Sequence, residues 1–314
     1  MNRQRIRHIA LALAFLLVLL GLLTAASLAY RPRDNTKKGG MYYNEAHGYL
    51  AYPEDEFDVF AFGCSNYYNG INPLSLWEQH GITCYDMCTG GQRVYEAYIH
   101  LREVLATHHP KVVLLDGYTV LREIDMDEAL FSTASYYFPV FFYHNNWKTY
   151  DWELLTAPVE YTNRNRNKGY RPGTKICKVE AGDYMAPTDE RGEFPLMNRI
   201  YLRKIARLCR ENDVALVIAA MPAPAIWDYG CYSVLQQDAQ SLGIPFLDLN
   251  LMLEELGIDF QTDFRDDGDH MNNTGAAKVT AYLGQVLSQE YGIADHRGDS
   301  AYAQWDEDLA DSKA

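Results

Sequence analysis

An unbroken apolar segment occupies most of the first thirty positions of the chain. From Ile9 to Ala29 no residue is charged, and only Thr24 and Ser27 carry a hydroxyl group. A helix of this length spans about 30 Å, the thickness of the hydrocarbon core of a bilayer. The pattern predicts that residues 1–30 are a signal anchor or a signal peptide.

The flanks of this segment leave both interpretations open. Three arginines precede it and four basic residues follow it within 31–38, so the charge rule does not decide its orientation. Small residues at 24–29 suit cleavage after Ala29. Because long domains cross membranes largely regardless of charge, we expect the body of the chain outside the cytoplasm. It is then either anchored in the membrane or secreted.

Short apolar runs alternate with amphipathic patterns in the rest of the chain. Within 93–108, apolar residues recur three and four positions apart, whereas 111–115 is a continuous apolar run of the kind found in buried parallel strands. The pattern predicts strands at 57–63, 82–87, 111–115, 214–220 and 245–249, and helices at 93–108, 196–212, 232–242 and 274–291. This alternation indicates an α/β fold with a doubly wound, mostly parallel sheet.

Other segments depart from that rhythm. Residues 31–56 contain prolines, glycines and mixed charges and predict a tether to a domain at 57–294, and residues 295–314 predict a solvated acidic tail. Residues 131–195 predict an insertion, either a functional lid or binding loop or a small aromatic core. Its aromatic residues include Tyr136, Tyr137, Phe138, Phe141, Phe142, Tyr143, Trp147 and Trp152.

Composition and charge narrow the classes of function. Of 314 residues, 48% are hydrophobic and 22% charged, which excludes a disordered chain. Beyond residue 38 there are 21 basic and 41 acidic residues, a formal charge of −20. A body this acidic is repelled by phosphate backbones, so we expect no nucleic-acid partner. The six cysteines lack zinc-site spacing; we expect mostly buried thiols, with one or two disulfides as an alternative.

A serine follows the first predicted strand, in the sequence Gly63-Cys64-Ser65-Asn66. Ligands of doubly wound sheets bind beyond the carboxyl ends of the strands. A serine at this turn can therefore act as a nucleophile with backbone N–H groups nearby, although the same pattern also serves as a helix N-cap.

A second candidate element lies directly before the last predicted helix, in residues 263–272. Asp267 stands three residues before His270, a spacing that lets a carboxylate hold Nδ1 while Nε2 takes a proton from a serine. An acidic turn that caps the helix is the main alternative. An EF-hand loop is disfavoured by Arg265 at its third position and Thr274 at its twelfth.

Together these elements resemble the SGNH (GDSL-like) hydrolase family, in particular its membrane-anchored branch associated with acylation of bacterial cell-envelope polymers. The resemblance covers residues 57–290 and implies a flavodoxin-like three-layer fold. It implies Ser65 as nucleophile, His270 as general base and Asp267 as the residue that orients it. The turn Thr89–Gln92 matches the second block, so Gly90 or Gly91 would join the N–H of Ser65 in the oxyanion hole.

Two positions depart from the family pattern. The family's third block supplies an asparagine to the oxyanion hole, whereas this chain has Asp116. An ionised carboxylate cannot donate a hydrogen bond, so a third donor would have to come from Asn66, Asn145 or Asn146. The first block reads Gly-Cys-Ser in place of Gly-Asp-Ser.

The leading hypothesis is a serine esterase or O-acyltransferase that acts on O-acyl groups, acetyl above all, of an extracytoplasmic polysaccharide or cell-wall polymer. The alternative is a non-catalytic, anchored partner of a membrane-bound acyltransferase that binds a glycan. A metal-dependent phosphoesterase is disfavoured, because His100, His108 and His109 have no matching ligand spacing. We expect no cofactor and no metal site.

Overall fold

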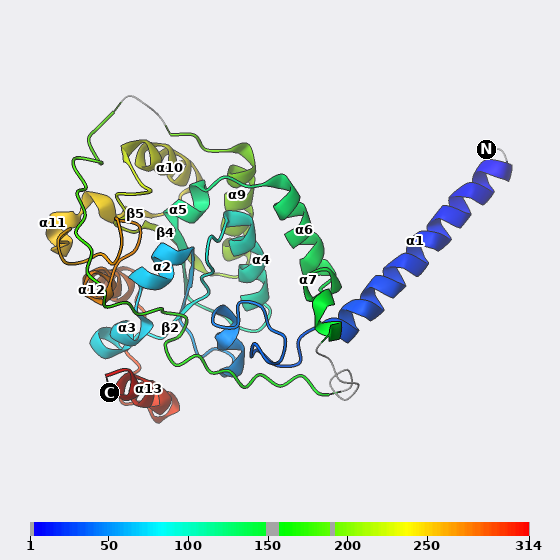
Figure 1. The fold of residues 1–314 in the computed structure, drawn as a ribbon, viewed down its shortest axis with the longest axis horizontal. Coiled ribbons are helices and arrows are strands. Elements are labelled where there is room, and N and C mark those ends of the chain that lie inside the picture. Colours follow the sequence, from blue (N-terminus) through cyan, green and yellow to red (C-terminus); the bar gives the residue numbers. More distant parts are fainter. Residues whose placement is uncertain (1–2, 149–156, 189–191, 314) are drawn as a thin grey trace. The chain divides into compact units, whose positions relative to one another are not determined.

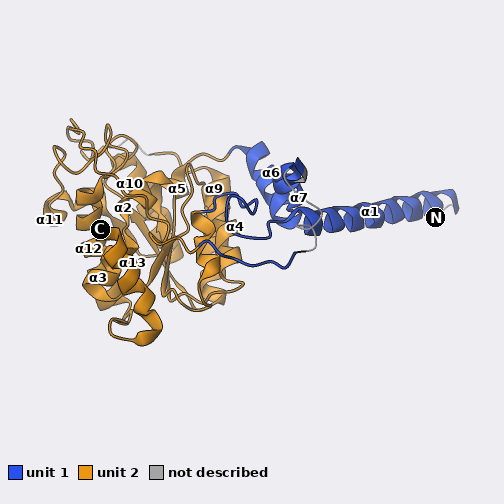
Figure 2. Ribbon diagram, turned by 60° about the horizontal axis from the view of Figure 1, so that its bottom comes forward, with its two compact units in different colours: residues 1–44, 125–163 blue, residues 45–124, 164–314 orange. Residues whose placement is uncertain are grey.

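The computed structural model describes residues 3–148, 157–188 and 192–313. Two compact units make up the chain (Figure 2). We call Met1–Asn44 with Asp125–Asn163 the anchor unit, and Glu45–Ile124 with Arg164–Ala314 the sheet unit. Each unit is built from two separate stretches of the chain.

Five parallel strands form the centre of the sheet unit, in the order β2-β1-β3-β4-β5 (Figure 1). Their bounds are β1 Val59–Phe62, β2 Cys84–Asp86, β3 Val112–Asp116, β4 Ala215–Ala220 and β5 Phe246–Asp248. This is the flavodoxin-like order of a doubly wound sheet, so the predicted fold class is confirmed. β1, β2, β4 and β5 lie within their predicted ranges, and β3 ends one residue past its range, at Asp116. Continuous apolar runs favour such strands because they can be buried on both faces.

Helices cover both faces of this sheet. They are η1 Ala46–Ala51, α2 Ser65–Gly70, α3 Pro73–His80, α4 Val94–Val104, α5 Gly117–Leu121, α9 Leu196–Glu211, α10 Tyr229–Leu242, η3 Leu249–Leu251, α11 Leu253–Leu256, α12 Asn273–Glu290, η4 Ser300–Tyr302 and α13 Ala303–Lys313. Here η denotes a 3₁₀ helix. Helices α2, α3 and α12 pack together, as do α4 and α9. The four long helices predicted from the sequence are α4, α9, α10 and α12.

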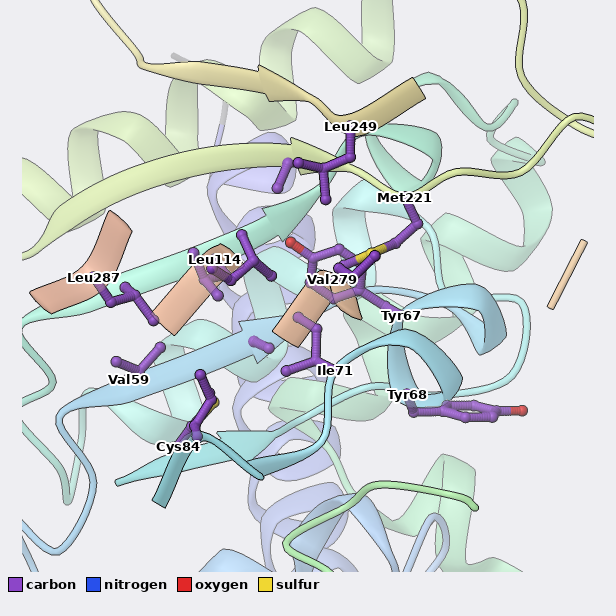
Figure 3. Close-up of a cluster of buried hydrophobic side chains, with 14 of the residues drawn as sticks. Val59, Tyr67, Tyr68, Ile71, Cys84, Leu114, Met221, Leu249, Val279 and Leu287 are labelled. Carbon is purple, nitrogen blue, oxygen red and sulfur yellow. The ribbon is translucent and has the colours of Figure 1, made fainter. Parts of the chain in front are cut away.

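One face of the sheet carries the main core (Figure 3). Val59 and Leu114 point to this face and share the cluster with Val279 of α12 and with Tyr67 and Ile71 of α2. All five side chains are fully buried. Helix α2 begins with the candidate serine. The packing of α2 in this core therefore fixes the position of that serine.

The C-terminal segment differs from the prediction of a solvated acidic tail. Residues 303–313 form helix α13, in which Trp305 is fully buried against Trp77 and Phe57. Buried Asp308 forms an ion pair with Lys168, whose side chain is also completely buried. Apolar burial and ion pairing therefore make this segment a structural part of the sheet unit.

The predicted tether and insertion also have different boundaries in the structure. The first stretch of the anchor unit ends at Asn44, and the following residues fold into η1, where Tyr49 is 1% exposed. The insertion at 131–195 divides between the units: 125–163 belongs to the anchor unit and the rest to the sheet unit. Trp152 lies outside the described residues.

In the described part of the anchor unit the helices are α1 Arg3–Tyr30, α6 Met126–Tyr137, α7 Val140–Tyr143 and η2 His144–Lys148. Helix α1 is long and apolar enough to cross a membrane, with a mean hydropathy of 2.8 over its most apolar window, of which no residue is buried. Its C-terminal end packs against α7 and η2. The Nδ2 group of Asn146 donates to the carbonyl of Tyr30 at 3.4 Å.

Candidate active site

Ser65 lies at the carboxyl edge of the sheet. Strand β1 ends at Phe62, Cys64 is the N-cap of α2, and Ser65 is the first residue of that helix. Between them, Gly63 has no room for a side chain, because a Cβ there would lie 2.7 Å from the Cβ atoms of Asp116 and Tyr67. Since β1 lies between β2 and β3, the serine occupies the switch point where ligands bind in such sheets.

The imidazole of His270 meets this serine from a loop far away in the sequence. Its Nε2 lies 2.7 Å from Ser65 Oγ, a hydrogen-bonding distance. The loop is fixed just beyond the histidine, because Asn272 caps α12 through the N–H groups of Thr274 and Gly275. The sequence-predicted pair of Ser65 and His270 is therefore brought together.

The carboxylate on the other ring nitrogen comes from Asp266. Its Oδ2 contacts His270 Nδ1, and its Oδ1 accepts the backbone N–H groups of Asp269 and His270 at 3.0 and 2.9 Å. The turn needs Gly268 at φ +103°, a conformation that disfavours other residues. This geometry corrects the assignment of Asp267, which is exposed and has Oδ1 3.6 Å from Cys177 Sγ.

The two carboxyl groups that flank the imidazole of His270 have pKa values shifted in opposite directions. Burial alone would raise the pKa of Asp266, but hydrogen bonds from the backbone and ring of His270 outweigh it and lower this pKa. Asp269 has Oδ2 3.5 Å from His270 Nε2, and burial raises its pKa. Asp266 therefore stays ionised and can stabilise an imidazolium.

The turn of residues 89–91 adjoins the serine loop, because the N–H of Thr89 donates to the carbonyl of Gly63 at 3.1 Å. Gly91 has φ +72°. Among the described residues, the backbone N–H groups of Ser65, Gly90 and Gly91 form no hydrogen bond. These groups remain available to a ligand, as an oxyanion hole requires.

Asp116 has a structural role at the end of β3. It is fully buried and caps α5, with Oδ1 accepting from Tyr118 N–H and Oδ2 from Thr119 N–H, both at 3.1 Å. Burial raises its pKa despite these hydrogen bonds. With its oxygens directed to the helix, Asp116 does not replace the missing asparagine donor.

Of the asparagines named as substitutes, Asn66 does not fill the gap, and a donor from Asn145 or Asn146 stays a prediction. The Nδ2 group of Asn66 is buried and has no hydrogen-bond partner among the described residues, so a substrate cannot reach it in this conformation. Asn145 and Asn146 belong to the anchor unit.

A cation that the sequence analysis missed stands beside the glycine turn. A Cβ on Gly91 would lie 3.2 Å from Nη1 of Arg122, and the positive charge of Arg122 also acts on Cys64 and Asp269. Buried Asn198 on α9 fixes this position, because its Nδ2 donates to the carbonyls of Val120 and Arg122 at 2.8 Å each. A basic residue shortly after the third strand is the signal that could have identified Arg122.

An open cavity of about 550 Å³ lies next to Asp266. Lys175 and Arg265 are among its lining residues. Two cations in this lining favour hydroxyl-bearing or anionic groups over a purely apolar chain. All six cysteines are free thiols, so the alternative with disulfides is not realised in this structure.

No protein-family model and no curated protein matches this chain. Among solved structures, the chain is similar to a GDSL-like lipase from Bacteroides thetaiotaomicron, with 12% identity, a TM-score of 0.38, and 75% of this chain and 89% of that chain covered. It is also similar to an acetyl xylan esterase, with 12% identity, a TM-score of 0.38, and coverage of 74% and 98%.

A psychrotrophic esterase from Pseudoalteromonas sp. is similar at 9% identity and a TM-score of 0.41, with 75% of this chain and 99% of that chain covered. Likeness at this level carries no argument about activity. The functional conclusion rests on the side chains of this chain.

Proposed function

We propose that this chain is a serine esterase or O-acyltransferase of the SGNH type. The observation that carries the proposal is the hydrogen-bonded series in which Ser65 Oγ meets His270 Nε2 and Asp266 meets His270 Nδ1. Nucleophile, base and orienting carboxylate are the three parts of a catalytic triad, which is recognised by geometry and not by fold.

In the first step, Ser65 Oγ attacks the carbonyl carbon of an ester while His270 Nε2 takes the hydroxyl proton. Asp266 stabilises the resulting imidazolium through Nδ1–H. The tetrahedral intermediate collapses, the alcohol leaves with the proton from His270, and the acyl group stays on Ser65. Water or a sugar hydroxyl then loses its proton to His270 and attacks the acyl-enzyme, which returns Ser65 to its starting state.

The oxyanion of each intermediate would accept hydrogen bonds from the backbone of Ser65 and of Gly90 or Gly91. Arg122 adds positive charge beside this turn, whereas Asp116 offers no donor. Loss of one oxyanion donor lowers kcat by about 10²–10³-fold, so we expect a modest rate on simple esters.

We further propose that the substrate is an O-acylated, most simply O-acetylated, polysaccharide or cell-wall polymer outside a bacterial cytoplasm. The apolar helix α1 supports a membrane location, and the cations of the cavity beside Asp266 support a polar substrate. A membrane-bound acyltransferase that supplies or consumes the acyl group is a suitable partner for such an enzyme.

Covalent labelling of the full-length chain in detergent tests this function. A fluorophosphonate probe should label the wild type once, at Ser65, and p-nitrophenyl acetate should be hydrolysed. Ser65→Ala should lose both signals, whereas Ser241→Ala, at an exposed position on α10, should keep both. Equal hydrolysis by wild type and Ser65→Ala would disprove the assignment of the nucleophile.

The capping role of Asp116 favours one second candidate, a non-catalytic glycan-binding partner of an acyltransferase. That function predicts no fluorophosphonate labelling in any variant and glycan binding that survives His270→Ala. Labelling of the wild type at Ser65 excludes it.

A further inference from the structure

Three side chains with metal-ligand chemistry converge in the sheet unit, separate from the serine site. His47 comes from η1, and His100 and Glu103 come from one face of α4, three residues apart. Their ligand atoms all lie within 4.8 Å of one another. Two imidazoles and one carboxylate from two elements form a cluster that no step of the proposed reaction uses.

The distances in this cluster fit a tetrahedral metal site. Glu103 Oε2 lies 3.1 Å from His100 Nδ1 and 3.6 Å from His47 Nε2. Tetrahedral Zn²⁺ with bonds of about 2.0–2.1 Å holds neighbouring ligand atoms about 3.3 Å apart. The two observed distances lie on either side of this value, and the ligand atoms of His47 and His100 lie within 4.8 Å of each other.

Burial in the cluster also suits a metal. The side chains of His47 and His100 are 10% and 11% exposed, whereas that of Glu103 is 35% exposed. The carboxylate is the most exposed of the three groups, so an ion would enter from its side. Imidazole with carboxylate suits Zn²⁺ and related transition metals, whereas Ca²⁺ and Mg²⁺ prefer sites made of oxygen alone.

We propose that His47, His100 and Glu103 bind one Zn²⁺ ion that fastens η1 to α4. Helix η1 follows directly after the boundary between the two units at Asn44. The ion therefore holds the first segment of the sheet unit on its core. Because such an ion binds the folded state and not the separated ligands, it raises the free energy of unfolding.

Calorimetric titration of Zn²⁺ into the full-length chain, stripped with a chelator and kept in detergent, tests the proposal. We expect one ion per chain and a rise in Tm on addition of Zn²⁺. His100→Gln and Glu103→Gln keep side-chain size and hydrogen-bonding groups, and each should weaken affinity by more than about 100-fold, beyond the effect of losing an outer partner of a ligand. Circular dichroism of each variant checks folding.

Two control variants make the result specific. His109→Gln removes an exposed histidine that pairs with Asp55 through a 2.8 Å contact, and this variant should bind Zn²⁺ like the wild type. His270→Gln changes a histidine that contacts two carboxylates at the serine site and should also retain binding.

Three outcomes overturn the proposal: no Zn²⁺ binding by the wild type, binding unaffected by His100→Gln, or binding lost in His270→Gln alone. One further test uses the wild type alone and so does not depend on the folding of any variant. Co²⁺ bound in place of Zn²⁺ should give the visible absorption of a tetrahedral site, and its absence would also refute the assignment.

Discussion

Asp266 and Asp267 are neighbours in the chain, but their carboxylates meet different partners. Both stand close enough to His270 in sequence to reach Nδ1, so spacing alone could not separate them. The backbone decides, because the left-handed Gly268 curls the turn around Asp266 and leaves Asp267 exposed. Ser65 and His270 were predictable because each stands beside an element with a strong pattern, a buried strand and the last helix.

Matched amide substitutions test this assignment. Asp266→Asn should lower kcat for p-nitrophenyl acetate by about 10³–10⁴-fold, because an amide stabilises neither the required tautomer nor the imidazolium. Asp267→Asn should leave kcat within about twofold of wild type, since its carboxylate does not touch the ring. A larger loss in Asp267→Asn would reverse the assignment.

Burial of Asp86 should make the stability of the folded chain depend on pH. It ends β2, is fully buried, and neither carboxylate oxygen has a hydrogen-bond partner among the described residues. Burial raises its pKa well above the ordinary value of 3.8. The folded chain therefore holds a proton that the unfolded chain releases, so stability falls as pH rises above about 4.

Asp86→Asn should remove this dependence. At pH 7 we expect the variant to exceed the wild type in free energy of unfolding by at least about 1 kcal/mol, since one unit of pKa shift corresponds to about 1.4 kcal/mol. The difference should shrink as the pH falls below 3.8, where Asp86 is increasingly protonated in both states. Urea unfolding at several pH values measures it, and a difference independent of pH would contradict a protonated Asp86.

At the scale of elements, the strands and long helices followed from the sequence but α13 did not. Six acids in the last twenty residues indicated a solvated tail, and its contacts lie too far away in sequence for a local pattern to show. Trp305 donates to Glu56 Oε1 at 2.7 Å, and Asp308 pairs with Lys168. Helix η1 was missed for the same reason, since its buried partners lie on other elements.

Removal of one charge from α13 should expose the importance of its buried ion pair. Asp308→Asn leaves Lys168 buried without its counter-ion, so we expect a loss of about 3 kcal/mol in free energy of unfolding. Asp311, also on α13, pairs with Arg166 from another segment of the chain. Both side chains are more than half exposed, so the effect of Asp311→Asn should stay below about 1 kcal/mol. Chemical denaturation measures both variants. An equal loss of free energy of unfolding in Asp308→Asn and Asp311→Asn would contradict the stabilising role of the buried pair.

At the scale of the whole molecule, the aromatic insertion belongs with the apolar helix. Val140 donates its N–H to Ser27 Oγ at 3.4 Å, and α7 and η2 pack on α1. The sequence could not reveal this pairing, because amphipathic periodicity is weak in short helices. The described aromatic residues thus form part of the unit that carries α1.

We predict that α1 stays on the chain as an anchor. Intact mass measurement of the protein from the membrane fraction should include residues 1–29, and the chain should resist extraction by carbonate. Paired Leu16→Arg and Leu17→Arg substitutions should release it, because each charge near the centre of a helix costs about 2.5–3.5 kcal/mol to insert, whereas paired alanines should not. A mass lacking residues 1–29 would instead show a signal peptide.

The discontinuity of the anchor unit bears on how the body could be shed from a cell. The chain passes between the two units after residue 44, after residue 124 and after residue 163. A protease that cuts once after Asn44 separates α1 from the body in covalent terms, but α7 and η2 remain joined to the body and still grip α1. One cut at this boundary alone therefore does not release the body from α1, because two other crossings still join the two units.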